Sequence, residues 1–260
     1  MGGCRRFLPF LTALLLCIPS CAGKKAVSVP EGPSPDSRLV LLAEQGDVEA
    51  RYTLGCMYAQ GRRVSQDFAK SASWYRMAAE QGHAPAQCSL GKLYMRGRGV
   101  PQDYREALRW FRMAAEQGDT DAQTSLGTMY AGGKGVPRDY ETAAEWFRRA
   151  AGRGNADAQY NLGVLYIQGK GVPQWFAEAA RWFRMAAEQG EGSAQYSLGI
   201  MHKEGDGVPR DSVQAYMWLS LAAEQGVGKA VQARNALAGT MTKEQLARAR
   251  ALVKAFHEKK

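Results

Sequence analysis

The sequence lacks the residue clusters that metal binding and catalysis require. Its three histidines, His83, His202 and His257, are scattered over 260 residues, with no H-E-x-x-H pair and no cysteine–histidine cluster for zinc. The stretch 127–133 has the first glycine spacing of a phosphate-binding loop but lacks its lysine and its serine or threonine. We therefore predict no cofactor and no metal, and we expect a protein that is not an enzyme.

A long apolar run is also missing near the amino terminus. The run Phe7 to Ile18 is shorter than the roughly 20 residues that a membrane-spanning helix needs. Because Arg5 and Arg6 precede this run and small residues follow it, residues 1–20 have the layout of an export signal peptide.

The end of that segment, Ile18-Pro19-Ser20-Cys21, resembles a bacterial lipoprotein box, in which the cysteine is acylated and becomes the first mature residue. An ordinary signal peptide that leaves Cys21 unmodified or removed is the alternative. The next residue is not the aspartate that favours inner-membrane retention, so the resemblance implies a periplasmic lipoprotein of the outer membrane, held there only by its lipid. Residues 21–36 contain three prolines and are expected to form a flexible tether.

Acidic charge is in deficit, with 25 aspartates and glutamates against 34 lysines and arginines and a formal net charge of +9. An exported protein does not meet genomic DNA, so this balance indicates solubility and a preference for anionic partners rather than nucleic-acid binding. Cell-envelope polymers such as peptidoglycan are the anionic partners that it suggests.

A 36-residue repeat organises the rest of the chain. The stretch His83 to Gly118 recurs at this step, which is typical of a solenoid whose units bury their apolar faces only by stacking on their neighbours. Five whole units fill residues 47–226. Residues 37–46 match the end of a unit and are expected to cap the first end of the stack, while residues 227–260 hold a degenerate repeat and a closing cap helix.

Each unit is predicted to contain two helices, so the expected fold class is an all-α, α/α solenoid. The first helix opens at a capping residue such as Asp47, Asp119 or Asn155 and ends at a glycine-rich turn. Unit one has Arg63 in place of the second turn glycine, and we expect its turn to be looser or differently shaped.

The second helix is expected to open at an aspartate cap and to end at a glycine in the left-handed conformation. Unit four has Trp175 in place of the aspartate. Loss of this cap should lower the free energy of unfolding by about 1 kcal/mol. The expected caps are Asp67, Asp103, Asp139 and Asp211, and the expected final glycines are Gly82, Gly118, Gly154, Gly190 and Gly226.

Glycine inside a helix costs about 1 kcal/mol relative to alanine, yet every first helix has one in its middle. We expect compensation from close contact between the two helices of a unit, helped by alanines of the second helix. The leucines before these glycines and the tryptophans of the second helices should fill the space between units. The glycines are Gly55, Gly91, Gly127, Gly163 and Gly199; the alanines are Ala78, Ala114, Ala150, Ala186 and Ala222.

The shared pattern A-x-Q-x-x-L-G-x-x-Y-x-x-G-x-G-V-x-x-D-x-x-x-A-x-x-W-x-x-x-A-A-x-x-G resembles the Sel-one-like repeat family, relatives of tetratricopeptide repeats. The resemblance covers about residues 47–226. It implies a right-handed superhelix of paired antiparallel helices whose first helices line a concave face, and an adaptor or scaffold role in protein complexes.

Comparison of the five copies indicates a candidate binding surface. Positions that differ between copies are free from the demands of stacking, and on the first helix they fall four residues apart, on one stripe. Tyrosines mixed with polar side chains suit a protein or peptide partner, while a solvated face that varies freely is the alternative. The residues of this first-helix stripe are Tyr52, Cys56, Gln60, Cys88, Lys92, Arg96, Thr124, Thr128, Gly132, Tyr160, Val164, Gln168, Tyr196, Ile200 and Glu204.

Two further patterns are expected to be structural. Cys56 and Cys88 lie in neighbouring first helices, which pack about 8 to 10 Å apart, too far for a disulfide that needs α-carbons within about 7 Å. Arginines on the second helices are expected to form a solvated ladder, paired with glutamates four residues later. The arginines are Arg76, Arg112, Arg148 and Arg184, and the glutamates are Glu80, Glu116 and Glu188.

The predicted function is thus a monomeric, non-enzymatic scaffold. The alternative is a protein that binds beta-lactams or the cell wall, with weak hydrolysis, because some exported relatives are described that way. Ser89 and Lys92 do match the S-x-x-K of penicillin-interacting enzymes. The repeat copies Ser125 and Ser197 lack the lysine, and the chain has no S-D-N or K-T-G partner, so coincidence explains the match better.

Overall fold

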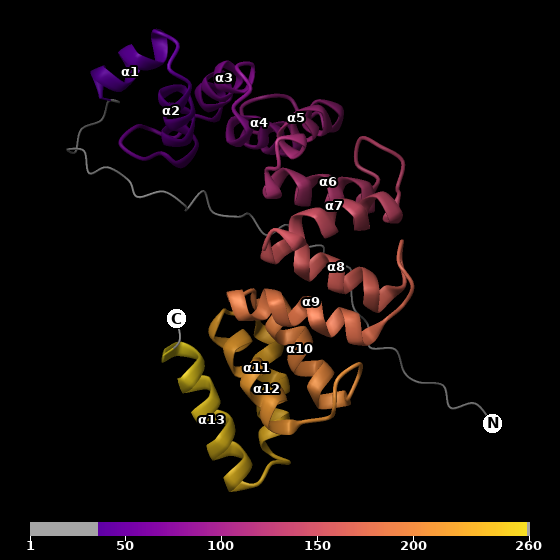
Figure 1. Cartoon of the computed structure of the whole chain (residues 1–260). Coiled ribbons are helices and arrows are strands. Elements are labelled where there is room, and N and C mark those ends of the chain that lie inside the picture. The colour runs from indigo at the N-terminus through magenta and orange to yellow at the C-terminus, as the bar shows by residue number, and fades with distance from the viewer. Residues whose placement is uncertain (1–35, 259–260) are drawn as a thin grey trace.

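The computed structural model describes residues 36–258 of the chain (Figure 1). This part contains thirteen α-helices and no strand. The predicted export signal, the lipidated Cys21 and nearly all of the tether lie outside the described residues. The helices are α1 (Ser37–Glu44), α2 (Val48–Gln60), α3 (Phe68–Ala79), α4 (Ala84–Arg96), α5 (Tyr104–Glu116), α6 (Thr120–Gly132), α7 (Tyr140–Gly152), α8 (Ala156–Gln168), α9 (Phe176–Gln189), α10 (Gly192–Glu204), α11 (Ser212–Glu224), α12 (Gly228–Ala238) and α13 (Lys243–Glu258).

Helices α2 to α11 form five consecutive pairs that follow the predicted units. Each first helix packs along its own second helix, and each second helix packs on the next first helix along the chain. Figure 1 shows the pairs stacked in one continuous, curved array from α1 to α13. The prediction of an all-α repeat solenoid is confirmed.

The first helices begin where the capping residues predict. The side-chain oxygens of Asp47, Asp119 and Asn155 each accept from the amide three residues later, at 2.7, 2.7 and 2.9 Å. The sequence analysis did not predict the caps of the other two first helices. There, Nδ1 of His83 accepts from the amide of Ala86 at 3.2 Å, and the carboxylate of Glu191 accepts from two amides.

The second helices begin at the four predicted aspartates, and all four side chains accept from backbone amides of the first turn. Trp175 stands in the same extended conformation but makes no side-chain cap, and its side chain is 59% exposed. The final glycines all adopt the predicted left-handed conformation, with φ between 82° and 97°.

The turn inside each of units two to five holds that unit against the one before it. A Cβ on the second turn glycine would overlap backbone atoms at the start of the preceding second helix, so only glycine permits this approach. The basic residue beside three of these glycines also lies over the aromatic ring that opens that helix, at 5.2 to 5.8 Å. The glycines and the residues they face are Gly99 with Phe68, Gly135 with Tyr104, Gly171 with Tyr140, and Gly207 with Phe176.

The turn of unit one was predicted to be looser or differently shaped, and this is wrong. Arg63 adopts φ of 61°, the left-handed conformation of its glycine counterparts. The amide of Asp67 donates to the carbonyl of Tyr58 at 3.0 Å, the same closing bond that Asp103 makes to Tyr94. Gly99, the counterpart of Arg63, approaches the start of α3, whereas α1 begins only at Ser37, later in the repeat register.

The glycine in the middle of each first helix makes room for a large side chain of the second helix. A Cβ on Gly91 would lie 2.8 Å from Cε1 of Phe111, and the other four glycines face Tyr75, Phe147, Phe183 and Leu219 in the same way. The prediction of close contact within the unit is therefore confirmed, but the contact group is this ring or leucine. The alanines expected to help this contact are also fully buried.

Leucines and tryptophans fill the space between units. Leu54, Leu90, Leu126, Leu162 and Leu198 are all fully buried. Trp110, Trp182 and Trp218 are also buried, whereas Trp74 and Trp146 are half-buried. Trp110 of α5 packs with buried residues of α3, and Trp146 of α7 packs with those of α5, so the tryptophans do join neighbouring units.

The arginine ladder on the second helices is not paired as predicted. Nη2 of Arg76 donates to the hydroxyl of Tyr94 at 2.6 Å, and Nη2 of Arg112 donates to that of Tyr130 at 3.2 Å. Among residues 36–258, none of these arginines forms an ion pair with the glutamate four residues later. Arg76 and Arg112 therefore each connect their own unit to the next one instead of pairing along their own helix.

The carboxyl-terminal end is closed as predicted. Thr242 and Gln245 cap each other at the start of α13, with bonds of 2.9 and 3.2 Å. Helix α13 then lies on α11, with Ala249 fully buried and Phe256 edge-on to Trp218 at 5.7 Å between ring centroids. No helix among the described residues is long and apolar enough to cross a membrane.

The turn glycine predicts a measurable difference between two alanine substitutions. Gly82 and Gly99 both have positive φ, of 87° and 69°, but a Cβ on Gly82 meets nothing within 4 Å whereas one on Gly99 overlaps Phe68. Gly82→Ala should lower the free energy of unfolding by about 1 kcal/mol through its backbone conformation alone. Gly99→Ala should lower it by at least about 2 kcal/mol more, because the new Cβ also overlaps the backbone of Phe68. Urea unfolding measures both, and equal losses would contradict the proposed contact between units.

His202 predicts a loss of stability in acid. It stands where the other units have a tyrosine, and burial followed by the nearby Arg184 lowers its pKa from the ordinary value of 6.5. Below pH 6.5 His202 is therefore protonated in the unfolded chain but still neutral in the native chain. The free energy of unfolding falls as the pH drops. His202→Tyr should remove this pH dependence. The free energy of unfolding of the variant should therefore rise relative to that of the parent between pH 7 and pH 5, as measured by thermal unfolding. A difference that does not change with pH would contradict it.

Candidate functional site

The structure divides the first-helix stripe into accessible and buried parts. Cys88, Thr124, Thr128 and Ile200 are at most 9% exposed, so the prediction that the variable positions are all free from stacking is wrong for these four. Cys88 packs with Phe111, and Ile200 packs with other buried residues of its unit. The half-buried members are Tyr52, Cys56, Lys92, Arg96, Gly132, Tyr160, Val164 and Tyr196, and the exposed members are Gln60, Gln168 and Glu204.

Two of the three stripe tyrosines, Tyr52 and Tyr160, lie against aromatic rings. The ring of Tyr52 lies 5.7 Å from that of Tyr75 and 4.7 Å from that of His83, which belongs to the next unit. The ring of Tyr160 lies 5.6 Å from that of Phe183, the ring that fills the space left by Gly163. These contacts fix the rings while leaving part of each accessible.

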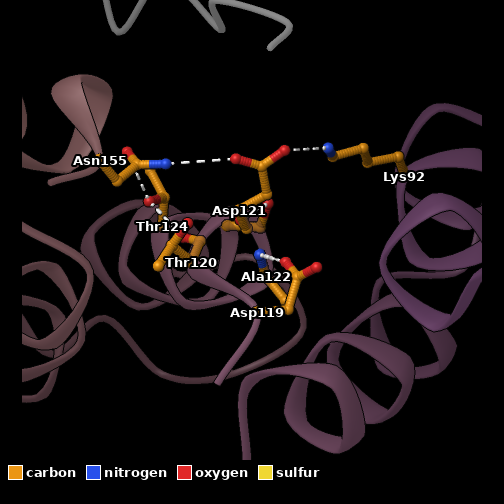
Figure 2. A network of polar contacts seen from close by, with 8 residues as sticks. Lys92, Asp119, Thr120, Asp121, Ala122, Thr124 and Asn155 are labelled. Carbon is orange, nitrogen blue, oxygen red and sulfur yellow. Dashed lines mark hydrogen bonds and ion pairs between the residues drawn. The ribbon is translucent and has the colours of Figure 1, made fainter. Parts of the chain in front are cut away.

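A polar network joins three units in the middle of the stripe. Nζ of Lys92 lies 3.1 Å from Oδ2 of Asp121, and Nδ2 of Asn155 donates to Oδ1 of the same carboxylate at 3.2 Å. Oγ1 of Thr124 donates to Oδ1 of Asn155 at 3.1 Å. Figure 2 shows Asp121 between Lys92 on one side and Asn155 on the other. This network orders side chains of α4, α6 and the start of α8.

Carboxylates gather at the amino-terminal ends of the same first helices. Burial, followed by the charges of Glu191 and Asp121, raises the pKa of Asp157. Burial also raises the pKa of Asp119, although its bond from the amide of Ala122 opposes this. Successive units therefore bring negative charge close together along this edge of the stripe.

Among residues 36–258, Cys56 and Cys88 form no disulfide with each other. Burial raises the pKa of the Cys88 thiol far above its ordinary value, and the nearby Lys92 only partly offsets the effect. The thiol therefore stays neutral at physiological pH and is not available as a thiolate nucleophile.

The residues that could suggest catalysis have structural contacts. Lys92, the lysine of the S-x-x-K match, pairs with a carboxylate of the next unit. His83 caps α4 and lies 3.3 Å from Glu49, while Nε2 of His257 lies 2.8 Å from Glu224. Within residues 36–258, no group of three or more histidines, cysteines and carboxylates is placed to hold a metal ion.

The sequence analysis missed Asp121 and Asp157 as members of the site. Both lie two residues after the cap of a first helix, a position occupied by Glu49, Pro85 and Ser193 in the other units. This position varies between copies by the same criterion that defined the stripe. The comparison of the copies could therefore have indicated this position, but the predicted stripe began three residues later, at Thr124 in unit three.

Comparison with known proteins agrees with the repeat. The Sel1 repeat model matches five consecutive segments, residues 48–83, 84–119, 120–155, 156–191 and 192–227. No match was found among curated proteins. The matched segments differ by one residue from the predicted units 47–226.

Two solved structures are similar over most of the chain. A protective antigen of uropathogenic Escherichia coli strains with an SLR fold is 37% identical, with a TM-score of 0.74, over 85% of this chain and 48% of the antigen. A Sel1 repeat protein from Oxalobacter formigenes is 39% identical, with a TM-score of 0.69, over 75% of this chain and 57% of its own. This chain thus spans about half the length of these relatives. Its five matched repeats and its helix pairing show that the chain belongs to the Sel1 repeat family.

Proposed function

We propose that this chain is a scaffold that binds a protein or peptide partner along the accessible part of the first-helix stripe, on the concave face of the solenoid. Sel1 repeat proteins typically serve as scaffolds for protein interactions. The observation that carries the proposal is the pair of half-buried tyrosines, Tyr160 and Tyr196, on adjacent first helices. An aromatic side chain that is already ordered loses little conformational entropy when a partner binds.

The charge beside these tyrosines suggests the chemistry of the partner. Asp121, Asp157 and Glu191 belong to three successive first-helix starts, and the pKa of Asp157 is raised partly by the other two carboxylates. A lysine or arginine from a partner would relieve that repulsion, because opposite charges across an interface favour correct pairing. A segment with a basic residue next to an apolar one therefore fits this part of the stripe.

The cell envelope is the proposed location. It is supported by the layout of residues 1–20 and by the lipoprotein box at Cys21, which would attach the solenoid to a membrane through a lipid. Binding of peptidoglycan or beta-lactams remains the alternative function, and the ion pair of Lys92 with Asp121 argues against a catalytic use of Ser89.

Crosslinking from the stripe tests the partner-binding face. A photoreactive amino acid at position 160 or 196 of the full chain, in the cells that produce it, should capture a defined protein. The same group at Arg148, which is exposed on α7, is the matched control. We expect recovery from the tyrosine positions to exceed that from Arg148 by about tenfold, the effect of one aromatic anchor at an interface. Equal recovery from all three positions, or none, would contradict the proposal.

Neutralising Asp157 tests the charge preference separately from folding. Asp157→Asn should weaken capture from position 160 by about three- to tenfold. It should also leave the native state at least as stable, because the charged form is disfavoured there. Glu145→Gln, which removes an exposed carboxylate from α7, is the control and should change neither measurement. Unchanged capture with Asp157→Asn would exclude the carboxylate from the interface.

A further inference from the structure

An arginine and a tyrosine join neighbouring units in the first part of the array. Nη2 of Arg76 on α3 donates to the hydroxyl of Tyr94 on α4, and Nη2 of Arg112 on α5 donates to that of Tyr130 on α6. Each bond connects the second helix of one unit to the first helix of the next. At these two boundaries the guanidinium therefore meets a neutral side chain with a polar tip.

The boundary between units four and five has a histidine in place of that tyrosine. The corresponding residues there are Arg184 on α9 and His202 on α10. His202 is buried, and its Nδ1 lies 3.4 Å from the carbonyl oxygen of Pro209, which can only accept a hydrogen bond. Nδ1 therefore carries the hydrogen of the neutral ring, and Nε2 is the atom that takes up a proton in acid. Protonation puts a second positive charge near Arg184.

The surroundings of His202 disfavour such a charge. Burial is the largest cause that lowers the pKa of His202, Arg184 of α9 adds to it, and Asp211 at the start of α11 opposes it. The carboxylate of Asp211 already accepts from two amides of α11, at 2.8 and 3.0 Å. On α10 itself, Lys203 and Glu204 pair with each other at 2.8 Å. The carboxylate that could balance a protonated His202 is therefore engaged in capping a helix.

Two other substitutions lie at the same boundary. Trp175 begins α9 without a side-chain cap, whereas aspartates cap the other second helices. Asp206 stands in the turn of unit five, where the basic residues of units two to four lie over the aromatic ring that opens the preceding second helix. Both changes remove a stabilising contact. In an array whose units contact only their neighbours, a weak boundary separates before the rest unfolds.

We propose that the boundary between α9 and α10 is an acid-sensitive joint, which opens when His202 takes up a proton and thereby releases a partner held across it. Tyr160 on α8 and Tyr196 on α10, the two aromatic anchors of the proposed partner-binding face, lie on opposite sides of this boundary. Figure 1 shows α9 between the helices that carry them. The release rests on the proposed function, whereas the joint is a property of the fold itself.

Hydrogen exchange of the full chain tests the joint without a partner. After correction for the intrinsic effect of pH on amide exchange, the protection of α10 relative to α4 should fall about tenfold or more between pH 7 and pH 5, because an uncompensated charge enters a buried contact. His202→Tyr, which restores the residue of the other units, should abolish this fall. His257→Gln is the control and should retain it, since His257 pairs with Glu224 on the surface of the last helices. No fall in the parent, or an equal fall in His202→Tyr, would overturn the joint.

Photocrosslinking at two pH values tests the release. In a lysate of the cells that produce the chain, capture by a photoreactive amino acid at position 160 should be about threefold lower at pH 5 than at pH 7, because the closed form is no longer the main one. His202→Tyr should make the two captures equal. Acid loss that persists in His202→Tyr would overturn the release and assign it to the stripe carboxylates. No capture at either pH would overturn the partner-binding face and the release together, while the exchange result still decides the joint.

Discussion

Each 36-residue unit can bury its apolar surface only against a neighbour, and the closest such contact is made by the second glycine of the turn. Gly99 and its counterparts bring the turn against the backbone that opens the preceding second helix. The buried leucines of the first helices and the tryptophans of the second then meet across the same boundary. A side chain on the glycine would push the units apart, so this contact sets the spacing on which the other packing depends.

That spacing also decides what the first helices can offer a partner. It places Asp121 between Lys92 and Asn155, so that one carboxylate joins residues of three units. It buries Cys88 and Thr124, and it leaves Tyr160 half-buried against Phe183. The accessible surface is thus a set of ordered side chains held by the stack, which suits recognition better than chemistry. Its negative edge contrasts with the net positive charge of the whole chain.

The two ends show how an array of this kind is terminated. The carboxyl-terminal cap places Phe256 on Trp218 and turns charges outward, which completes the packing of the last unit. At the amino-terminal end of the described residues, α1 packs on α2 and leaves Leu41 and Leu42 exposed.

The sequence by itself determined the helices, most of their caps and their order, because these depend on local residues and on a strict period. Asp103, Gly118 and the capping box at Thr242 could each be assigned from a few neighbouring residues. Contacts between helices were decided only by the tertiary structure. The sequence could not show that Phe111 fills the space beside Gly91, that Arg76 reaches Tyr94, or that Thr124 is buried, because each depends on a side chain from another helix. Variation between copies indicated a stripe on the first helices, but only the packing between units separated its buried positions from its accessible ones.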